Sequence, residues 1–252
     1  MRTPTDGAGG ADGEAVTLST GETVSLPLVT DATMTGAAFG ADRSGVAALL
    51  PAGLAPVPTA RGRAAVLLLC VGYGRVGAGE IPAYDEFGVL VPAVERSASA
   101  VPYAGALSGR VGAYVWTLPV TNEPGRALGV ELWGYPKWVA DITHEDHGRR
   151  RRTTVRADGQ HLLTLDVRRP PTVSAGVSGA SYTERGGSLL REPLELTGEV
   201  GVWPYSGAVS LRLGEHPLAE RLSALELGQR ALARFAAEAE FTIHAGRVVG
   251  QD

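Results

Sequence analysis

One lysine stands among 22 arginines in this chain of 252 residues. It is Lys137, which follows Trp133, Tyr135 and Pro136 and precedes Trp138. A guanidinium keeps its proton at any working pH, whereas a buried ammonium can lose its proton and act as a nucleophile or base. A lysine between apolar aromatic residues in an arginine-rich chain therefore indicates that an amine is needed there. The alternative is one surface lysine left in an arginine-biased composition.

Other candidate sites carry less chemistry. His144 and His147 bracket a segment with metal-ligand residue types, but Gly148 and four arginines follow it, which is typical of a solvated turn. We expect no metal there. The chain is acidic overall, so we also expect no nucleic acid at the arginine run. Cys70 lies in an apolar run and should be a buried, inert thiol.

Composition sets the class of protein. Hydrophobic residues make up 44% of the chain and charged residues 20%, which is typical of a globular protein. The net charge of −4 gives no reason to expect an anionic membrane or nucleic acid as partner. One cysteine excludes an intrachain disulfide. We find no apolar stretch long enough to span a bilayer and no secretory leader, so we expect a cytoplasmic protein.

Short apolar runs separated by Gly, Pro and Asp predict strands over residues 66–71, 88–94, 111–120, 153–155 and 161–167. Asp158-Gly159 between the last two predicts a hairpin turn. Residues 42–50 read as a short helix with Asp42 as N-cap, and Asn122 is expected to cap another.

The rest of the chain is less regular. Residues 1–15 are expected to be a disordered tail, and residues 16–252 one domain. The Ser- and Gly-rich residues 172–187 read as a loop, and residues 200–205 and 208–213 as two strands that pair in a hairpin. Residues 218–237 scan as an amphipathic helix, although the strand-like residues 241–243 leave that segment ambiguous.

Asn122-Glu123-Pro124, followed by Glu131 through Lys137, resembles the acetoacetate decarboxylase family in both order and spacing. The segment 84–92, with Glu86, is similar to the family's strand that carries an active-site glutamate. Trp203 and residues 210–216 are similar to its late hairpin. The resemblance extends from about residue 30 onward and is strongest in these segments.

The resemblance implies a mainly β fold: an antiparallel β-barrel or cone with a few short peripheral helices and an internal pocket. It also implies a helical turn over residues 217–222 and a strand over residues 231–243. No dissociable cofactor is required. A homo-oligomer is expected from the resemblance alone.

In the resembled family the motif lysine, here Lys137, forms a Schiff base with a ketone. A protonated imine is an electron sink, so a bond to the α-carbon can break and leave an enamine. The amine must be neutral to attack, which requires a pKa well below the ~10.4 of free lysine. Burial among aromatic groups is expected to lower it. Glu86 is the expected general acid or base, with Asp85 as the alternative because strand neighbours face opposite sides.

The chain also departs from the family. Trp138 replaces a second lysine, the early strand 31–39 lacks the carboxylate-binding arginine, and residues 66–70 lack a second glutamate. An unpaired carboxylate would lose several kcal/mol on burial in such a pocket. We therefore expect a larger and less polar carbonyl substrate than acetoacetate. The aromatic residues expected to contact it are Trp133, Tyr135, Trp138, Tyr84 and Phe39.

Three functions remain open. The leading hypothesis is a lyase-type enzyme that decarboxylates, or performs aldol and dehydration chemistry on, a ketone or keto acid through Lys137. The alternative is a non-covalent cyclase of a polyketide-like intermediate in secondary metabolism. The third is a small-molecule binding protein. Glu131 is expected to order the turn before the lysine, or to pair with an arginine, rather than to do chemistry.

Overall fold

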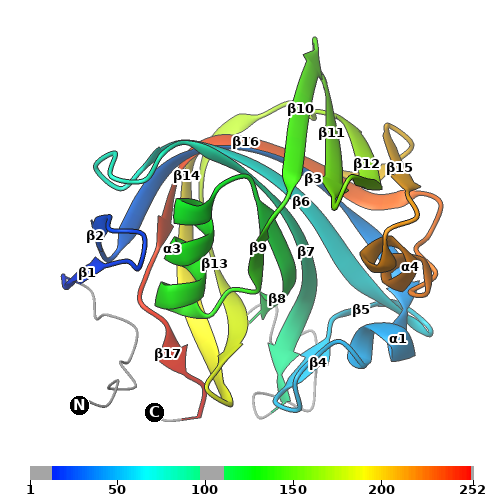
Figure 1. Cartoon of the computed structure of the whole chain (residues 1–252). Helices are drawn as coiled ribbons and strands as arrows, with labels where there is room; N and C mark the ends of the chain where they lie inside the picture. Colours follow the sequence, from blue (N-terminus) through cyan, green and yellow to red (C-terminus); the bar gives the residue numbers. More distant parts are fainter. Residues whose placement is uncertain (1–12, 97–110, 251–252) are drawn as a thin grey trace.

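Seven long strands form a closed barrel in the computed structural model, which describes residues 13–96 and 111–250 (Figure 1). In spatial order they are β7 (Tyr84–Glu95), β6 (Arg63–Val76), β3 (Leu28–Asp42), β16 (Ala231–Ile243), β14 (Ser188–Ser206), β13 (Val173–Arg185) and β8 (Val111–Val120). Pairing of β8 with β7 closes the circle.

The barrel is mixed, which corrects the expectation of an antiparallel one. Six of its neighbouring pairs are antiparallel, but β13 runs parallel to β8 at Ser181 and Tyr182. The reason lies in the connection: the chain leaves the barrel after β8, passes through a second sheet, and returns to β8 in β13 rather than through a hairpin.

Four shorter strands in the described residues pair with barrel strands. The strand β9 (Lys137–Val139) runs parallel to β8, and β4 (Leu54–Pro56), β5 (Pro58–Ala60) and β17 (Arg247–Val248) pair with β7, β6 and β14. The strands β1 (Ala15–Thr17) and β2 (Thr23–Ser25) form a separate two-stranded sheet. The predicted tail lies mainly in residues 1–12, outside the described residues.

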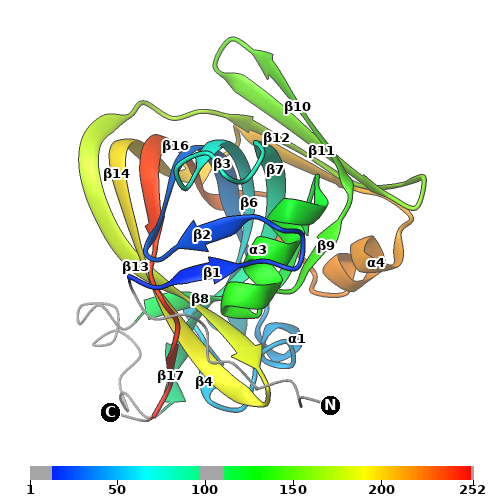
Figure 2. The ribbon, with the colours of Figure 1, turned by 60° about the vertical axis from the view of Figure 1, so that its left-hand side comes forward.

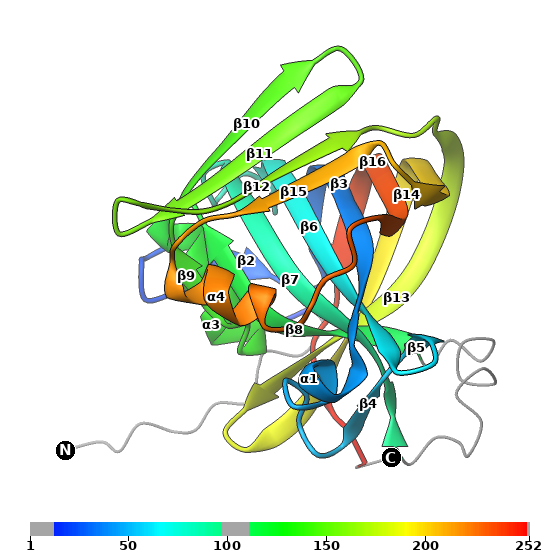
Figure 3. The same cartoon turned by 90° about the vertical axis from the view of Figure 1, so that its right-hand side faces the viewer.

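A second sheet stands outside the barrel (Figure 3). Its strands are β10 (Asp141–His147), β11 (Arg150–Ala157), β12 (Gln160–Arg168) and β15 (Val209–Leu213). An apolar core fills the space between this sheet and the outer faces of β3, β6 and β7. The predicted Asp158-Gly159 turn is confirmed: both residues have positive φ and join β11 to β12. Cys70 is buried in this core, and burial raises the pKa of its thiol to about 12.

Three short helices are present in the described residues: α1 (Arg43–Ala47), α3 (Glu123–Trp133) and α4 (Pro217–Ser223). The predicted caps are confirmed, because Asp42 and Asn122 each accept a hydrogen bond from the backbone three residues on. The long strands arch over α3 (Figure 1). The β1–β2 hairpin lies beside this helix (Figure 2), where the Ser19 amide donates to Glu131, 3.0 Å away.

Three expectations for the second half of the chain are settled. Residues 172–187 are not a loop, because most of them form β13. Residues 200–205 and 208–213 do not pair with each other: β14 pairs with β13 and β16, and β15 pairs with β12. The helix expected over residues 218–237 is limited to α4, which ends at Ser223. Residues 231–243 form strand β16, as the family resemblance implies.

No helix in residues 13–96 and 111–250 has the length and the apolar run that crossing a bilayer requires.

Candidate active site

A pocket of about 360 Å³ lies inside the barrel, and most of its lining is apolar. The wall includes leucines, valines and alanines of the barrel strands together with Leu128 and Trp133 of α3. The polar side chains that line it are Thr30, Tyr73, Tyr84, Glu86, Tyr135, Lys137, Ser181 and Glu195. No arginine lines the pocket in the part of the chain that the structure describes. Besides Glu195, two of these side chains are of ionisable types that carry a full charge: one lysine and one glutamate.

Those two charges belong to Lys137 and Glu86, which face each other. The Nζ atom of Lys137 lies 2.7 Å from Oε2 of Glu86, and the two side chains are 4% and 5% exposed. The other oxygen of Glu86 accepts a hydrogen bond from the Tyr73 hydroxyl at 3.1 Å. Lys137 also donates to the Tyr84 hydroxyl at 3.2 Å. An amine, a carboxylate and two phenols therefore meet in an apolar cavity.

Strand register brings these groups together. Glu86 and Tyr84 are two residues apart on β7 and so share the inward face. Tyr73 lies directly opposite Tyr84 on β6, with ring centroids 4.7 Å apart. Lys137, the first residue of β9, lies beside Leu118 of the neighbouring β8. The lysine is thus held at an edge strand next to the carboxylate-bearing wall.

The charge state of Lys137 differs from the expectation. Burial lowers the pKa of its ammonium, but the charge of Glu86 and the hydroxyl of Tyr84 raise it more, so the pKa lies above lysine's ordinary value. The prediction that burial would lower the pKa of Lys137 below its ordinary value is therefore wrong, because the opposing effect of Glu86 follows only from its 2.7 Å separation from the amine. Burial also raises the pKa of Tyr84, to about 12.

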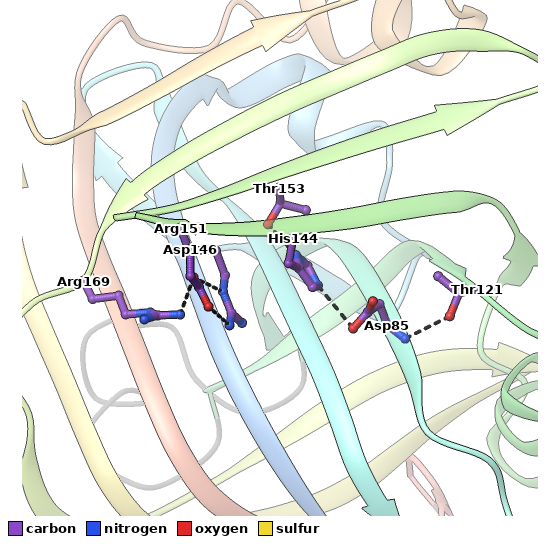
Figure 4. A network of polar contacts seen from close by, with 7 residues as sticks. All are labelled: Asp85, Thr121, His144, Asp146, Arg151, Thr153 and Arg169. Carbon is purple, nitrogen blue, oxygen red and sulfur yellow. Dashed lines mark hydrogen bonds and ion pairs between the residues drawn. The ribbon is translucent and has the colours of Figure 1, made fainter. Parts of the chain in front are cut away.

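Asp85 points away from the pocket, as alternation along a strand requires. Its carboxylate lies 3.5 Å from Nε2 of His144, and its amide donates to Thr121 (Figure 4). His144 in turn hydrogen-bonds Thr153, and burial lowers the pKa of its imidazole. Asp85 therefore joins the barrel wall to the second sheet. Within the described residues no three His, Cys, Asp or Glu side chains are close enough to hold a metal ion.

Three of the five predicted aromatic contacts line the pocket: Trp133, Tyr135 and Tyr84. The other two do not, which corrects the prediction. Phe39 and Trp138 pack into the core between the barrel and the second sheet, where Trp138 stacks on His216. The reason is the two-residue period of a strand, which turns Trp138 away when its neighbour Lys137 faces inward.

The sequence alone does not mark Gly129 as part of the site. It lies on α3, and a Cβ at this position would come within 2.4 Å of Cε and 2.5 Å of Cδ of Lys137. Its carbonyl accepts the amide of Tyr135. The helix therefore leaves room at this glycine for the lysine side chain to pass.

Replacing Gly129 by alanine should displace the Lys137 amine from Glu86 and lower any Lys137-dependent rate by about 10²-fold, since a misplacement of about 1 Å can have that effect. Gly176→Ala is the matched control, because a Cβ there meets nothing within 4 Å. Steady-state rates of the two variants check this. Equal rates for Gly129→Ala and Gly176→Ala would show that the lysine tolerates the shift.

Ser181 and Glu192 were also missed, because they lie in or beside the segment read as loop. Ser181 on β13 contacts the Tyr135 hydroxyl at 2.8 Å and donates to the fully buried Glu192 on β14 at 2.9 Å. No local signal marks these residues, since strand pairing brings Ser181 to the pocket wall and Glu192 to Ser181.

The family model described as acetoacetate decarboxylase (ADC) matches residues 16–252. None of the curated proteins matches the chain.

Solved structures share the fold. The enduracididine biosynthesis enzyme MppR, complexed with the condensation product of pyruvate and imidazole 4-carboxaldehyde, aligns with a TM-score of 0.59 at 16% identity, over 88% of each chain. An acetoacetate decarboxylase from Legionella pneumophila subsp. pneumophila str. Philadelphia 1 aligns with a TM-score of 0.63 at 17% identity, over 89% of this chain and 87% of its own. An acetoacetate decarboxylase-like enzyme from Sphingomonas wittichii RW1 aligns at 0.59 and 17% identity, over 88% and 92%. The family match over residues 16–252, on the same fold as these structures, establishes that the chain belongs to the acetoacetate decarboxylase family.

Proposed function

We propose that this protein is a lyase-type enzyme that acts on a ketone or keto acid through a Schiff base at Lys137. The observation that carries the proposal is the 2.7 Å pair of Lys137 and Glu86 in an apolar pocket. A lysine on the surface would be neither buried nor next to a carboxylate that can take its proton. In this arrangement an amine can be deprotonated beside the place where a carbonyl would bind.

Substrate binding supplies the change in charge state that the reaction needs. An apolar ligand excludes water from the pocket, which disfavours both charges and favours transfer of the proton from Lys137 to Glu86. The neutral amine then attacks the carbonyl carbon, and the oxygen receives the proton from Glu86. Loss of one water molecule from this carbinolamine gives the iminium ion.

The iminium accepts the electron pair of a bond to the α-carbon. If that bond leads to a carboxylate, carbon dioxide leaves and the enamine takes a proton at carbon. If it is a C–H bond, Glu86 takes the proton, and the enamine can add to an aldehyde before dehydration. Water then hydrolyses the imine and frees Lys137. The pyruvate condensation product bound to MppR supports the second route, and the decarboxylase relatives support the first.

We place the substrate among larger, apolar carbonyl compounds. A free carboxylate would be buried with no arginine on the described pocket wall, at a cost of several kcal/mol. Leucine and valine side chains instead favour an alkyl or aryl chain. MppR is a biosynthetic enzyme, which supports a role in secondary metabolism. We keep one domain over residues 16–252 and a cytoplasmic location as part of the proposal, and a homo-oligomer on the family resemblance alone.

The second candidate is a non-covalent cyclase, with Lys137 as a charged hydrogen-bond donor. The raised pKa of Lys137 favours it, because an ammonium polarises a carbonyl but cannot attack it. A pure binding protein would use the same groups without turnover.

Exchange of α-hydrogens for deuterium tests for enamine formation without assuming which bond breaks. We expect the protein in D₂O to exchange the α-hydrogens of long-chain methyl ketones faster than those of pyruvate, as followed by NMR. Lys137→Arg is the control, since it keeps the charge and removes the amine. A wild-type rate no faster than that of Lys137→Arg with every compound would contradict the Schiff-base proposal.

A further inference from the structure

Glu192 is a buried acid that the proposed chemistry does not use. It lies on β14 opposite Ser181 of β13, and its side chain is fully buried. Its Oε2 accepts a hydrogen bond from Ser181 at 2.9 Å, and its Oε1 lies 2.8 Å from the Thr183 hydroxyl. A buried carboxyl group is costly when it is charged, so its protonation state matters.

Counting protons fixes that state. The Thr183 hydroxyl lies 2.7 Å from the Trp133 carbonyl, which can only accept a hydrogen bond. A hydroxyl has one proton, so Thr183 cannot donate to both Trp133 and Glu192. Both contacts are hydrogen bonds when Thr183 donates to the carbonyl and Glu192 donates its own proton to Thr183. The geometry is therefore that of a neutral carboxylic acid.

Glu192 also holds both ends of the turn before the lysine. Through Thr183 it reaches the carbonyl of Trp133, the last residue of α3. Through Ser181 it reaches the hydroxyl of Tyr135. Gly134, with φ of 69°, turns the chain between them. Tyr135 then accepts the amide of Lys137 at 2.7 Å, and its ring centroid lies 6.0 Å from the lysine Nζ.

We propose that Glu192, as a neutral acid, is a positioning residue that fixes the turn from Trp133 to Tyr135 and so sets where the Lys137 amine stands. The proposal rests on the proposed function in one respect, namely that Lys137 is the reacting group. Loss of the Glu192 proton leaves Thr183 with one proton for two acceptors, so either its bond to Glu192 or its bond to the Trp133 carbonyl is lost and the turn loosens. The site would then be coupled to pH through a group that never touches the substrate.

The surroundings support a neutral acid at pH values below about 7. Burial raises the pKa of Glu192 to about 7, against its hydrogen bonds to Thr183 and Ser181 and the charge of Arg191 on the same strand. From the turn, Tyr135 faces it with a phenol whose pKa burial raises well above its ordinary value. On β13, the hydroxyls of Ser181 and Thr183 contact Glu192. In the C-terminal segment, Gly246 lies next to its side chain.

Glu192→Gln is the sharp test, because a glutamine amide can accept from Ser181 and donate to Thr183 as the neutral acid does. We expect it to keep the wild-type deuterium-exchange rate within about threefold at pH 6, whereas Glu192→Ala loses tenfold or more. Above pH 7 the wild-type rate should fall relative to that of Glu192→Gln. Glu199→Gln, at an exposed position on the same strand, controls for the loss of a charge.

Two readouts do not depend on catalysis, so they separate this proposal from the Schiff-base proposal. Selective ¹³C labelling of lysine gives a single side-chain probe, because the chain has one lysine. Its Cε shift should be unchanged in Glu192→Gln and moved in Glu192→Ala.

The second readout is unfolding by urea. The folded pKa of Glu192 is above its unfolded value, so the folded state holds one more proton between the two, and stability falls as pH rises toward 7. The folding constant of wild type should fall by up to about tenfold per pH unit relative to Glu192→Gln between pH 5 and 7. A Glu192→Gln variant that moves the lysine shift as Glu192→Ala does, or that keeps the wild-type pH dependence, would overturn the proposal.

Discussion

Lys137→Arg should abolish turnover, with a loss on the order of 10⁴-fold or more, because a guanidinium cannot form the imine on which every later step depends. The variant keeps the positive charge beside Glu86, so the ion pair can persist. The effect should therefore appear in kcat with little change in the free energy of unfolding. Turnover rates with the ketone that exchanges fastest check the loss in kcat. Urea unfolding of the same samples checks that the free energy of unfolding is unchanged.

A neutral replacement separates chemistry from stability. Lys137→Met leaves Glu86 buried without its positively charged partner, which is expected to destabilise the protein by about 3–5 kcal/mol. The double variant Lys137→Met, Glu86→Gln should recover much of that loss while remaining inactive. If Lys137→Arg keeps more than a tenth of the wild-type rate, the lysine is not the nucleophile.

Glu86→Gln should lower turnover by about 10²–10⁴-fold, the range expected when a general acid or base is removed. The amide oxygen of a glutamine can accept from Lys137 and its NH2 group can donate to the Tyr73 hydroxyl, so the fold should tolerate the change. The loss should be largest in the step that moves a proton to or from the α-carbon. Comparison of exchange rates with rates of imine formation identifies that step.

The same substitution should change how the amine responds to pH. The charge of Glu86 helps to hold the pKa of Lys137 above its ordinary value, against burial, which lowers it. Without that charge the effect of burial remains, and the pKa should fall. A ¹³Cε-lysine titration of Glu86→Gln should therefore show deprotonation at lower pH than wild type. A pKa that stays or rises would show that Glu86 does not set the charge of Lys137.

Much of the framework was predictable because its signals are local. The Asp42 and Asn122 caps, the Asp158-Gly159 turn and the β8 strand follow from short stretches of sequence. Strand β16 was reached through the family resemblance, since its alanines fit a helix equally well. β13 was missed because serine and glycine are poor strand formers, and its pairing with β14 and β8 comes from tertiary context.

The site residues also differ in whether local sequence could predict them. The motif marked Lys137 and the resemblance marked Glu86, but the effect of one on the other needed their 2.7 Å separation. Trp138 and Phe39 were assigned to the pocket by residue type alone, whereas the strand period turns them to the outer core. Ser181 and Glu192 act through contacts between distant segments, and Gly129 acts through the close approach of the Lys137 side chain to the helix. Such contacts leave no pattern in a single sequence.

The most direct test is borohydride reduction of the protein in the presence of a long-chain methyl ketone, followed by the mass of the intact chain and of its Lys137 peptide. We expect one adduct on Lys137, heavier by the ketone less one oxygen atom, and no adduct on that peptide in Lys137→Arg. Glycine is a suitable competitor for stray carbonyl compounds in solution. A folded wild-type protein whose Lys137 remains unmodified by every ketone and keto acid would contradict the Schiff base and leave cyclisation or binding in the same pocket.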